Sequence, residues 1–354
     1  MISMWLRQIG AVIRLEMAKT FLSKRGLWVY LLALAPVAIT SIHSLVELNQ
    51  GAQRKAFAAA RPVSAELLQG IKPGMTPDEV MEQLGEPHNK WAFQQRGKSF
   101  GSYQYTDGTD LYTFNFANGE LRNIGRETRD TIAQDTLIFA SIFQFFFLRL
   151  AIFFGCVGVF TNLFRGELLD RSLHYYLLTP LRREILVIGK YLAGLIATVV
   201  IFVTSAALQM WTLSWHFEKA EIAGYLNGPG WGHVFSYLGV TAAACLGYGS
   251  VFLAAGLFFK NPIIPAALVE GWESLNLFLP AALKKISVIY YLQSLCPIVA
   301  GPDENMNRYL KMLINAAEPV SAPVAIIGLF VVSALILVVA GRQARRLEIN
   351  YSTD

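Results

Sequence analysis

Residues 186–213 read LVIGKYLAGLIATVVIFVTSAALQMWTL and carry a single charged side chain, Lys190. A helix needs about 20 predominantly apolar residues to cross the ~30 Å hydrocarbon core of a bilayer. This stretch is long enough. Five others share its character: residues 27–47, 137–164, 233–259, 262–283 and 321–340. The sequence therefore predicts a mainly α-helical protein built around a polytopic six-helix transmembrane bundle.

The stretch 262–283 differs from the other five in composition. It contains two acidic residues, Glu270 and Glu273, and three prolines at 262, 265 and 280. Proline removes a backbone donor and interrupts a helix. Two alternatives are therefore open for this stretch, a full span and a broken or re-entrant helix.

The overall composition indicates a membrane protein with an additional aqueous part. Of the 354 residues, 54% are hydrophobic and 16% are charged, and the mean hydropathy is +0.41. Soluble domains contain roughly 25% charged residues. The net charge of +5 comes from basic residues beside the apolar stretches, which indicates a membrane surface and no nucleic-acid partner. Three widely separated cysteines support neither disulfides nor a zinc site, and we expect thiols at Cys156, Cys245 and Cys296.

Basic residues close to the apolar stretches predict the orientation, because cytoplasmic loops retain them. They precede the first stretch, separate the second from the third and follow the sixth: Arg7, Arg14, Lys19, Lys24, Arg25, Arg165, Arg171, Arg182, Arg183, Lys190, Arg342, Arg345 and Arg346. We predict a multi-pass protein of the cell inner membrane with both termini in the cytoplasm and residues 48–136 outside. Residues 4–24 predict an amphipathic helix at the membrane surface. A cleaved signal peptide over residues 1–47 is a weaker alternative, because its basic region is too long.

The predicted organisation has three parts. Residues 1–47 form the surface helix and the first span, and residues 48–136 form an extracytoplasmic α+β domain. Residues 137–354 carry spans two to six, with a cytoplasmic loop at 165–185 and an external helical segment at 284–320.

The extracytoplasmic domain has clear local signals within residues 62–126. A helix is predicted over residues 77–85, with Thr76 as its N-cap and Gly85 at its end. Strands at 102–105 and 111–116 are joined by an Asp107-Gly108 turn, and Asn118-Gly119 begins the next hairpin.

These residues resemble the SmpA/OmlA (BamE-like) family. The matching motifs are Gly74-Met75-Thr76, Leu84-Gly85-Glu86-Pro87 and Phe116-Ala117-Asn118-Gly119-Glu120-Leu121, within about 60 residues. Relatives of this type are periplasmic lipoproteins, but this chain has no lipobox cysteine, so its flanking spans would tether the domain. We expect a small αβ interaction or stabilising module without chemistry of its own, which could contact an extracytoplasmic protein partner through residues 62–126.

The loop between the second and third spans contains the motif on which the functional prediction rests. Its residues 168–177 place leucines and Tyr176 on one helical face, which predicts a short amphipathic helix that Thr179-Pro180 ends. The run of an acidic residue, then Leu-Leu-Thr-Pro, basic residues and Gly189-Lys190 is similar to the loop of ABC-2 type transporter permeases. An ordinary basic loop is the alternative interpretation.

The resemblance implies that this loop couples the chain to a separate ABC ATPase subunit. The residues carried over are Glu167, Asp170, Arg171, Leu177, Thr179, Pro180, Arg182, Arg183 and Lys190. It also implies a second permease subunit, identical or different, within the lipid bilayer. ATP and Mg²⁺ would be bound by the partner ATPase, and no cofactor by this chain. Gly97-Lys98-Ser99 lacks the glycine-rich turn and following helix of a phosphate-binding loop, so no ATP site is predicted here.

Three intramembrane charges complete the candidate site. Arg149, Glu270 and Glu273 lie at similar predicted depths, and a pairing of Arg149 with Glu273 would lower the cost of burying both. The five histidines show no recognisable metal-ligand spacing, and no catalytic constellation emerges. We therefore expect a non-enzymatic permease subunit of an ATP-driven ABC-2 type exporter. The alternative is a non-transporting membrane scaffold or sensor that presents the BamE-like domain to a cell-envelope partner.

Overall fold

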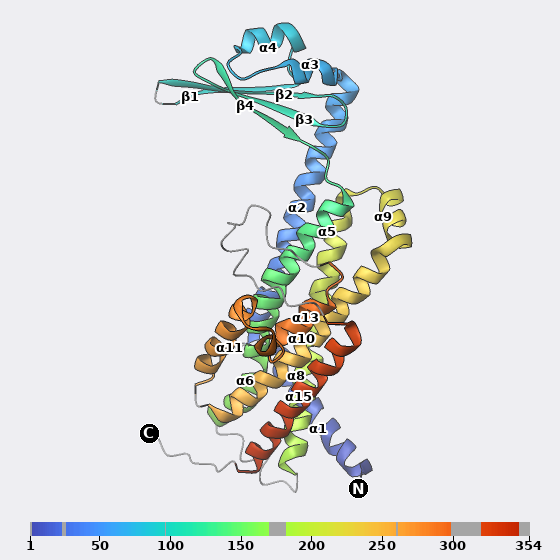
Figure 1. Ribbon diagram of the computed structural model, residues 1–354, viewed down its shortest axis with the longest axis vertical. Helices are drawn as coiled ribbons and strands as arrows, with labels where there is room; N and C mark the ends of the chain where they lie inside the picture. The colour runs from blue at the N-terminus through green and yellow to red at the C-terminus, as the bar shows by residue number, and fades with distance from the viewer. Residues whose placement is uncertain are drawn as a thin grey trace. The chain divides into compact units, whose positions relative to one another are not determined.

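The computed structural model describes residues 2–22, 26–95, 97–169, 182–259, 261–298 and 320–346. Internal contacts divide the chain into two compact units. The helical unit comprises residues 1–41, 136–212 and 219–354, and the αβ unit comprises residues 42–135 and 213–218. Figure 1 shows the elements of both units coloured by residue number.

The helical unit is built from apolar helices. Its elements are α1 (Ile2–Leu22), the first part of α2 (Leu27–Ala60), most of α5 (Ile132–Ser141), the π-helical η2 (Ile142–Ile152), α6 (Phe153–Leu169), α8 (Arg183–Leu213), α9 (Lys219–Tyr225), η4 (Leu226–Gly230), α10 (Trp231–Phe258), α11 (Ile263–Leu275), the 3-10 turn η5 (Asn276–Phe278), α12 (Ala281–Lys284), α13 (Val288–Leu295) and α15 (Ala322–Arg345).

Five helical stretches of the described residues are long and apolar enough to cross a membrane. They are Leu27–Ala60, Ile132–Glu167, Arg183–His216, Lys219–Phe258 and Ala322–Arg345. They coincide with five of the six predicted stretches. Large apolar side chains remain on the outside of two of them: Leu31 is 69% exposed, and Ile327 and Leu335 are each 62% exposed. Such surfaces suit hydrocarbon, and soluble monomers rarely expose contiguous apolar patches of this kind.

Residues 262–283 form the broken helix that was one of the two alternatives. α11 has 13 residues and is therefore only about 20 Å long, and it is followed by η5 and then by Pro280, which precedes α12. The described residues thus contain five candidate spans and not six. Part of the predicted external segment at 284–320 is helical as α13, and residues 299–319 lie outside the described part of the chain.

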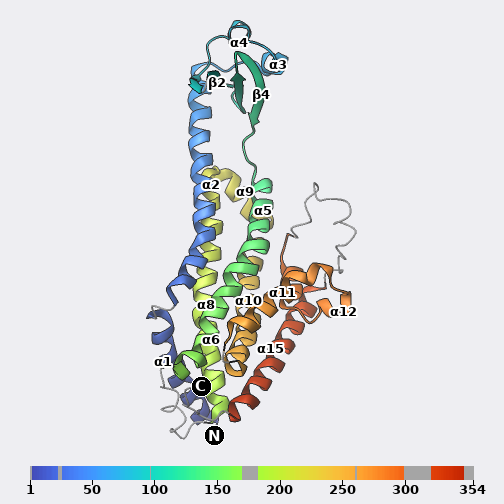
Figure 2. The same ribbon diagram turned by 90° about the vertical axis from the view of Figure 1, so that its left-hand side faces the viewer.

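Helix α10 occupies the middle of the helical unit, where it packs against α6 and α15 (Figure 2). Glycines permit the close approach. A side chain at Gly247 would lie 2.8 Å from Val288 and 2.9 Å from Leu329, and one at Gly256 would lie 3.1 Å from the backbone of Thr161. Gly247 is therefore the point at which α13 and α15 pack closely on α10. Gly239 has open space around it and contributes no such contact.

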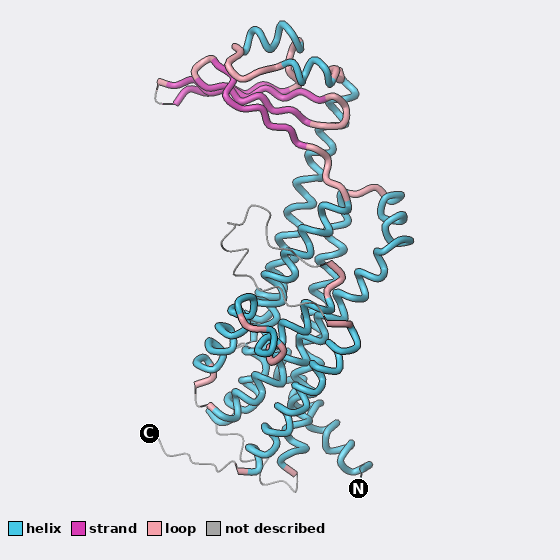
Figure 3. The backbone as a smooth tube through the Cα atoms, in the orientation of Figure 1, coloured by secondary structure: helices cyan, strands magenta, loops and turns pink. Residues whose placement is uncertain are grey.

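The αβ unit places two short helices on one face of an antiparallel meander (Figure 3). Its elements are the second part of α2, the first residues of α5, η3 (Ser214–His216), α3 (Ala65–Gly70), α4 (Pro77–Leu84), β1 (Asn89–Gln95), β2 (Lys98–Thr106), β3 (Leu111–Ala117) and β4 (Glu120–Glu127). Alternate residues of β3, Tyr112, Phe114 and Phe116, face the core because strand side chains alternate between faces. They pack with Val80 and Leu84 of α4.

Local signals in the αβ unit produce the predicted elements. Thr76 Oγ1 accepts a hydrogen bond from the Glu79 amide at 3.3 Å, and Glu79 Oε2 accepts one from the Thr76 amide at 2.8 Å. This reciprocal capping box starts α4 at its predicted residue. Gly85 ends the helix with φ +78°, and Asn118 and Gly119 both have positive φ in the predicted β3–β4 turn.

The turn between β2 and β3 is held by side chains. Asp107 Oδ1 accepts hydrogen bonds from the amides of Thr109 and Asp110, and the Tyr112 hydroxyl donates to Oδ2. Burial alone opposes ionisation of Asp107, but these three donors outweigh it and lower its pKa. Burial raises the pKa of Tyr105 to about 12. Tyr105 therefore stays neutral and its hydroxyl donates to the carbonyl of Gly85 at 2.9 Å.

The capping box predicts the effect of removing its hydroxyl. Thr76→Ala should destabilise α4 by about 1 kcal/mol, because the Glu79 amide loses its acceptor. Hydrogen-exchange mass spectrometry of the full-length protein should then show faster exchange in residues 77–84. Ser64→Ala is the matched control, because Ser64 is the N-cap of α3 but its side chain makes no capping bond. Unchanged exchange in Thr76→Ala would contradict the prediction.

Candidate functional site

Two of the predicted coupling residues belong to a cluster of charges in the helical unit that is buried except for Lys19. We define the Lys190 cluster as Glu16, Lys19, Glu167 and Lys190. Lys190 Nζ lies 2.6 Å from Glu16 Oε1 and 2.8 Å from Glu167 Oε2, and it donates to the carbonyl of Leu163 at 2.8 Å. Lys19 Nζ lies 3.0 Å from Glu167 Oε1. The cluster therefore connects α1, α6 and α8.

The neighbouring residues explain why these charges meet. Gly189 precedes Lys190, and a side chain there would lie 2.8 Å from Val12, so the glycine allows α1 to approach α8 closely. Val12 and Glu16 are four residues apart and lie on one face of α1. Val12 packs on Gly189 while Glu16 reaches Lys190. The side chain of Lys190 is fully buried, at 0% exposure, so its charge depends on these partners.

Glu167, one of the residues that the resemblance assigns to ATPase coupling, is turned inward. Its side chain is 8% exposed and lies in the Lys190 cluster. Glu167 therefore holds α6 to α1 and α8, and a charge reversal there would test the integrity of the bundle before any docking.

Two further coupling residues lie at the start of α8. The Arg182 guanidinium stacks over the Trp5 ring at 5.2 Å, and Arg183 Nη1 donates to the carbonyl of Arg345 at 2.8 Å. Glu184 forms an ion pair with Arg345. The start of α8 is thus tied to α1 and to the end of α15. The remaining predicted coupling residues lie outside the described residues: Asp170, Arg171, Leu177, Thr179 and Pro180.

Arg149 and Glu273 do meet, but through different atoms than predicted. Arg149 Nη1 donates to the backbone carbonyl of Glu273 at 3.1 Å. The Glu273 carboxylate accepts the amides of Val288 and Ile289 at 3.0 and 2.8 Å, and the hydroxyl of Ser287 at 2.8 Å. It therefore caps the positive N-terminus of α13, a favourable place for a carboxylate.

Glu270 lies one turn before Glu273 and accepts a single hydrogen bond, from Ser274 at 3.3 Å. Within the described residues, Nε and Nη2 of Arg149 and Oε2 of Glu270 are buried without a hydrogen-bond partner. The three predicted intramembrane charges are therefore unequally satisfied. Glu273 is fully engaged, whereas Arg149 and Glu270 keep polar atoms with no partner.

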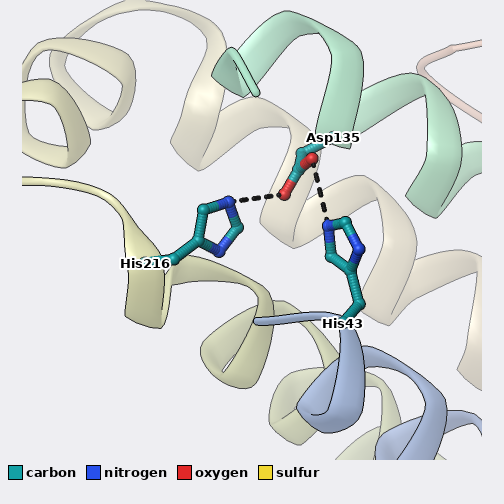
Figure 4. A group of neighbouring side chains, drawn as sticks. All are labelled: His43, Asp135 and His216. Carbon is teal, nitrogen blue, oxygen red and sulfur yellow. Dashed lines mark ion pairs between the residues drawn. The ribbon is translucent and has the colours of Figure 1, made fainter. Parts of the chain in front are cut away.

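The αβ unit contains a group of side chains that the sequence analysis did not connect. Figure 4 shows His43 of α2, Asp135 of α5 and His216 of η3 with their polar atoms turned toward one another. His43 Nε2 lies 3.4 Å from Asp135 Oδ1, and His216 Nε2 lies 3.2 Å from Asp135 Oδ2. The Asp135 side chain is 2% exposed. The facing atoms are two nitrogens and a carboxylate, so this histidine–aspartate cluster has the donor set of a metal site.

The surroundings of the histidine–aspartate cluster are polar on one side. His216 Nδ1 lies 3.3 Å from Ser44 Oγ, and Asp130 Oδ2 lies 3.7 Å from His43 Nε2. His216 also borders a cavity of about 410 Å³ whose lining includes Glu47 and Arg54. Glu47 and Arg54 are an ion pair with an O–N distance of 3.5 Å. A small molecule or water in this cavity could reach the cluster.

Sequence spacing could not reveal this cluster, because its members are 92 and 81 residues apart along the chain. Recognisable zinc motifs place ligands within a few residues of each other. The available signal was weaker: His43 and His216 each stand near the end of a long apolar stretch, where a polar side chain needs a partner.

No protein-family model matches this chain, and neither a curated protein nor a solved structure does. The functional arguments below therefore rest on the residues and their geometry.

The Lys190 cluster predicts a large stability effect. Lys190→Met should lower the free energy of unfolding by roughly 3–5 kcal/mol, because the buried carboxylates of Glu16 and Glu167 would lose the ammonium group that both contact. Thermal unfolding of the purified full-length protein in detergent measures the change. Lys55→Met is the control, because the Lys55–Glu218 ion pair is exposed on both sides and such pairs contribute little. Equal unfolding temperatures for the two variants would show that the buried cluster is not stabilising.

The two glutamates of α11 should differ in how much they contribute to the stability of the protein. Glu273→Gln should destabilise the protein by about 1–3 kcal/mol, because an amide nitrogen would face the backbone donors of α13. Glu270→Gln changes a side chain with one weak hydrogen bond and should have a smaller effect. The same thermal measurement compares them, and an equal or larger loss in Glu270→Gln would argue against the capping role of Glu273.

Proposed function

We propose that this chain is the membrane-spanning permease subunit of an ATP-driven exporter of the ABC-2 type, coupled to a separate ATPase subunit through residues 165–185. The observation that carries the proposal is the Lys190 cluster. It joins the two helices on either side of the loop, α6 and α8, to the N-terminal helix α1. Such a connection suits a loop that receives a mechanical load.

The physical argument concerns how a force on the loop would spread. When paired ATPase subunits close on ATP, a coupling loop is pushed toward the bilayer. Lys190 is fully buried and held by two carboxylates, so breaking its contacts during such a movement would be costly. The three helix ends would therefore move together as one body. The bonds from Arg183 to the end of α15 would include the last helix in this body.

The charges within the helical unit also support the proposal that the chain takes part in transport. Intramembrane ionisable residues are expensive and are functional candidates by default. Arg149 presents two buried donor nitrogens that no described residue satisfies, and Glu270 presents one such oxygen. We propose that they face the path between two permease subunits, where a polar group of the substrate or water would satisfy them.

A second function is favoured by one feature of the αβ unit. β1 is an edge strand that is exposed along its whole length, and Trp91 on it is 59% exposed. Trp91, Phe93 and Phe100 stack in a row, with ring centroids 4.6 and 5.2 Å apart. Exposed aromatic side chains on an unpaired strand edge suit a protein partner. This surface would serve a scaffold or sensor that presents the domain to a cell-envelope protein.

One co-purification experiment separates the two functions. Tagged full-length protein extracted from its native membrane should retain an ATPase subunit in stoichiometric amount. Leu177→Asp should remove most of it, because losing a buried apolar contact at the centre of an interface costs about 2 kcal/mol or more, roughly a 30-fold weaker complex.

Trp91→Ser is the matched control, and it should retain the ATPase. The opposite pattern favours the scaffold: an envelope protein that is retained by Leu177→Asp and lost in Trp91→Ser, with no ATPase in either sample. Retention of the ATPase by Leu177→Asp would overturn the coupling role of the loop.

A further inference from the structure

The structure assigns a binding site for a divalent transition-metal ion to His43, Asp135 and His216, and this inference is independent of the proposed function. The three side chains come from three separate segments of the αβ unit. Their donor atoms all lie within 4.8 Å of one another. The site would take an ion of the Zn²⁺ type, bound by two imidazole nitrogens and one carboxylate.

The distances fit a shared ion. Zinc binds histidine nitrogen and carboxylate oxygen at about 2.0–2.2 Å in tetrahedral geometry, which places two ligand atoms roughly 3.4 Å apart. The separations from Asp135 oxygens to His43 Nε2 and His216 Nε2 are 3.4 and 3.2 Å. The imidazole rings are nearly perpendicular, with an interplanar angle of 89°. Two rings crossed in this way can direct nitrogen lone pairs at one point from different sides.

The polar atoms of the cluster need a partner that the described residues do not provide. Both carboxylate oxygens of Asp135, His43 Nε2 and His216 Nε2 are buried and make no hydrogen bond that satisfies the geometry. An unsatisfied buried carboxylate is costly. A divalent cation between these four atoms would compensate the carboxylate charge and use the nitrogen lone pairs at the same time.

The contact of the other ring nitrogen of His216 supports the tautomer that metal binding requires. Metal-bound histidines usually donate their other ring N–H to a nearby acceptor. In His216 this other nitrogen is Nδ1, which lies 3.3 Å from Ser44 Oγ. With the proton on Nδ1, the lone pair of Nε2 faces Asp135. Ser44 follows His43 directly on α2, so one turn of this helix supplies both a ligand and the group that orients another ligand.

The donor set selects the class of ion. Imidazole suits zinc, copper, iron and nickel, whereas Mg²⁺ and Ca²⁺ prefer oxygen ligands throughout. The cysteines Cys156, Cys245 and Cys296 are buried and belong to the helical unit, so no thiolate joins the site. Three protein ligands beside a cavity leave a coordination position that water from the side of Glu47 could fill.

Binding would fasten the αβ unit where its chain segments converge. The ligands are far apart in sequence, so one ion would close two long loops. It would fix the start of α5 and η3 against α2. Since the unfolded chain has no preformed site, the binding free energy would add to the folding free energy.

Metal content of the full-length protein tests the site. Protein purified in detergent is stripped with a chelator, reloaded with Zn²⁺, desalted and analysed by inductively coupled plasma mass spectrometry. We expect one equivalent in the wild type and loss of it in Asp135→Asn and His216→Ala. His233→Ala is the matched control, because His233 bonds Tyr225 outside the site and should leave the equivalent in place. Equal zinc in the wild type and Asp135→Asn overturns the inference.

A second measurement does not depend on how the variants fold. Co²⁺ added to the stripped wild-type protein should give a visible absorption band of a four- or five-coordinate nitrogen and oxygen site at one equivalent, and Zn²⁺ should displace it. An octahedral aqueous spectrum, or less than a tenth of an equivalent of bound zinc, overturns the site. The residues would then be a hydrogen-bonded histidine–aspartate network.

Discussion

The helical unit depends on one buried cation. A lysine with no exposed side-chain surface has lost its hydration, and only charged or polar partners can compensate this loss. Lys190 obtains them from Glu16, Glu167 and a backbone carbonyl. Since these groups lie on α1 and α6 and Lys190 lies on α8, the three helices are fixed relative to one another at the level of the charge. Apolar packing alone would allow small slides, whereas a charge pair at 2.6 Å does not.

Small residues complement the charges further along the helices. Gly189 brings α1 onto α8 next to the cation, and Gly247 and Gly256 bring α13, α15 and α6 onto α10. Within a bilayer, lipid tails are as apolar as the side chains, so close packing and buried polar contacts must supply the association energy. The helical unit uses both. Glu273 adds a third kind of contact. Its carboxylate accepts the free amides at the start of the short helix α13, which would otherwise be unsatisfied in an apolar environment.

Sequence reasoning succeeded where the decisive interactions are local. Five spans follow from runs of apolar residues, and α4 begins at Thr76 because its capping partner Glu79 is three residues away. β1 was missed because all of it is exposed, so it shows no alternation of apolar and polar residues. The partners of Lys190 and Glu273 could not be predicted from the sequence either. Glu16 is 174 residues from Lys190, and equal depth suggested an ion pair between Glu273 and Arg149 although the α13 amides compete for the same carboxylate.

The partners of the other buried carboxylates can be compared with those of Asp135 in the histidine–aspartate cluster. Among the residues that the structure describes, Glu16 and Glu167 bind lysine, Asp110 accepts from Arg126 at 2.7 Å, and Glu273 accepts two amides and a hydroxyl. Asp135 is as buried as these, but its carboxylate faces two imidazoles. A neutral imidazole can donate one N–H to a carboxylate, but neither ring makes a hydrogen bond to Asp135 in this geometry. Neutral rings also carry no positive charge, so they leave the charge of the carboxylate uncompensated. A single divalent ion satisfies the neutral rings and the carboxylate together, so the requirement that Glu16, Glu167, Asp110 and Glu273 meet points to a cation here.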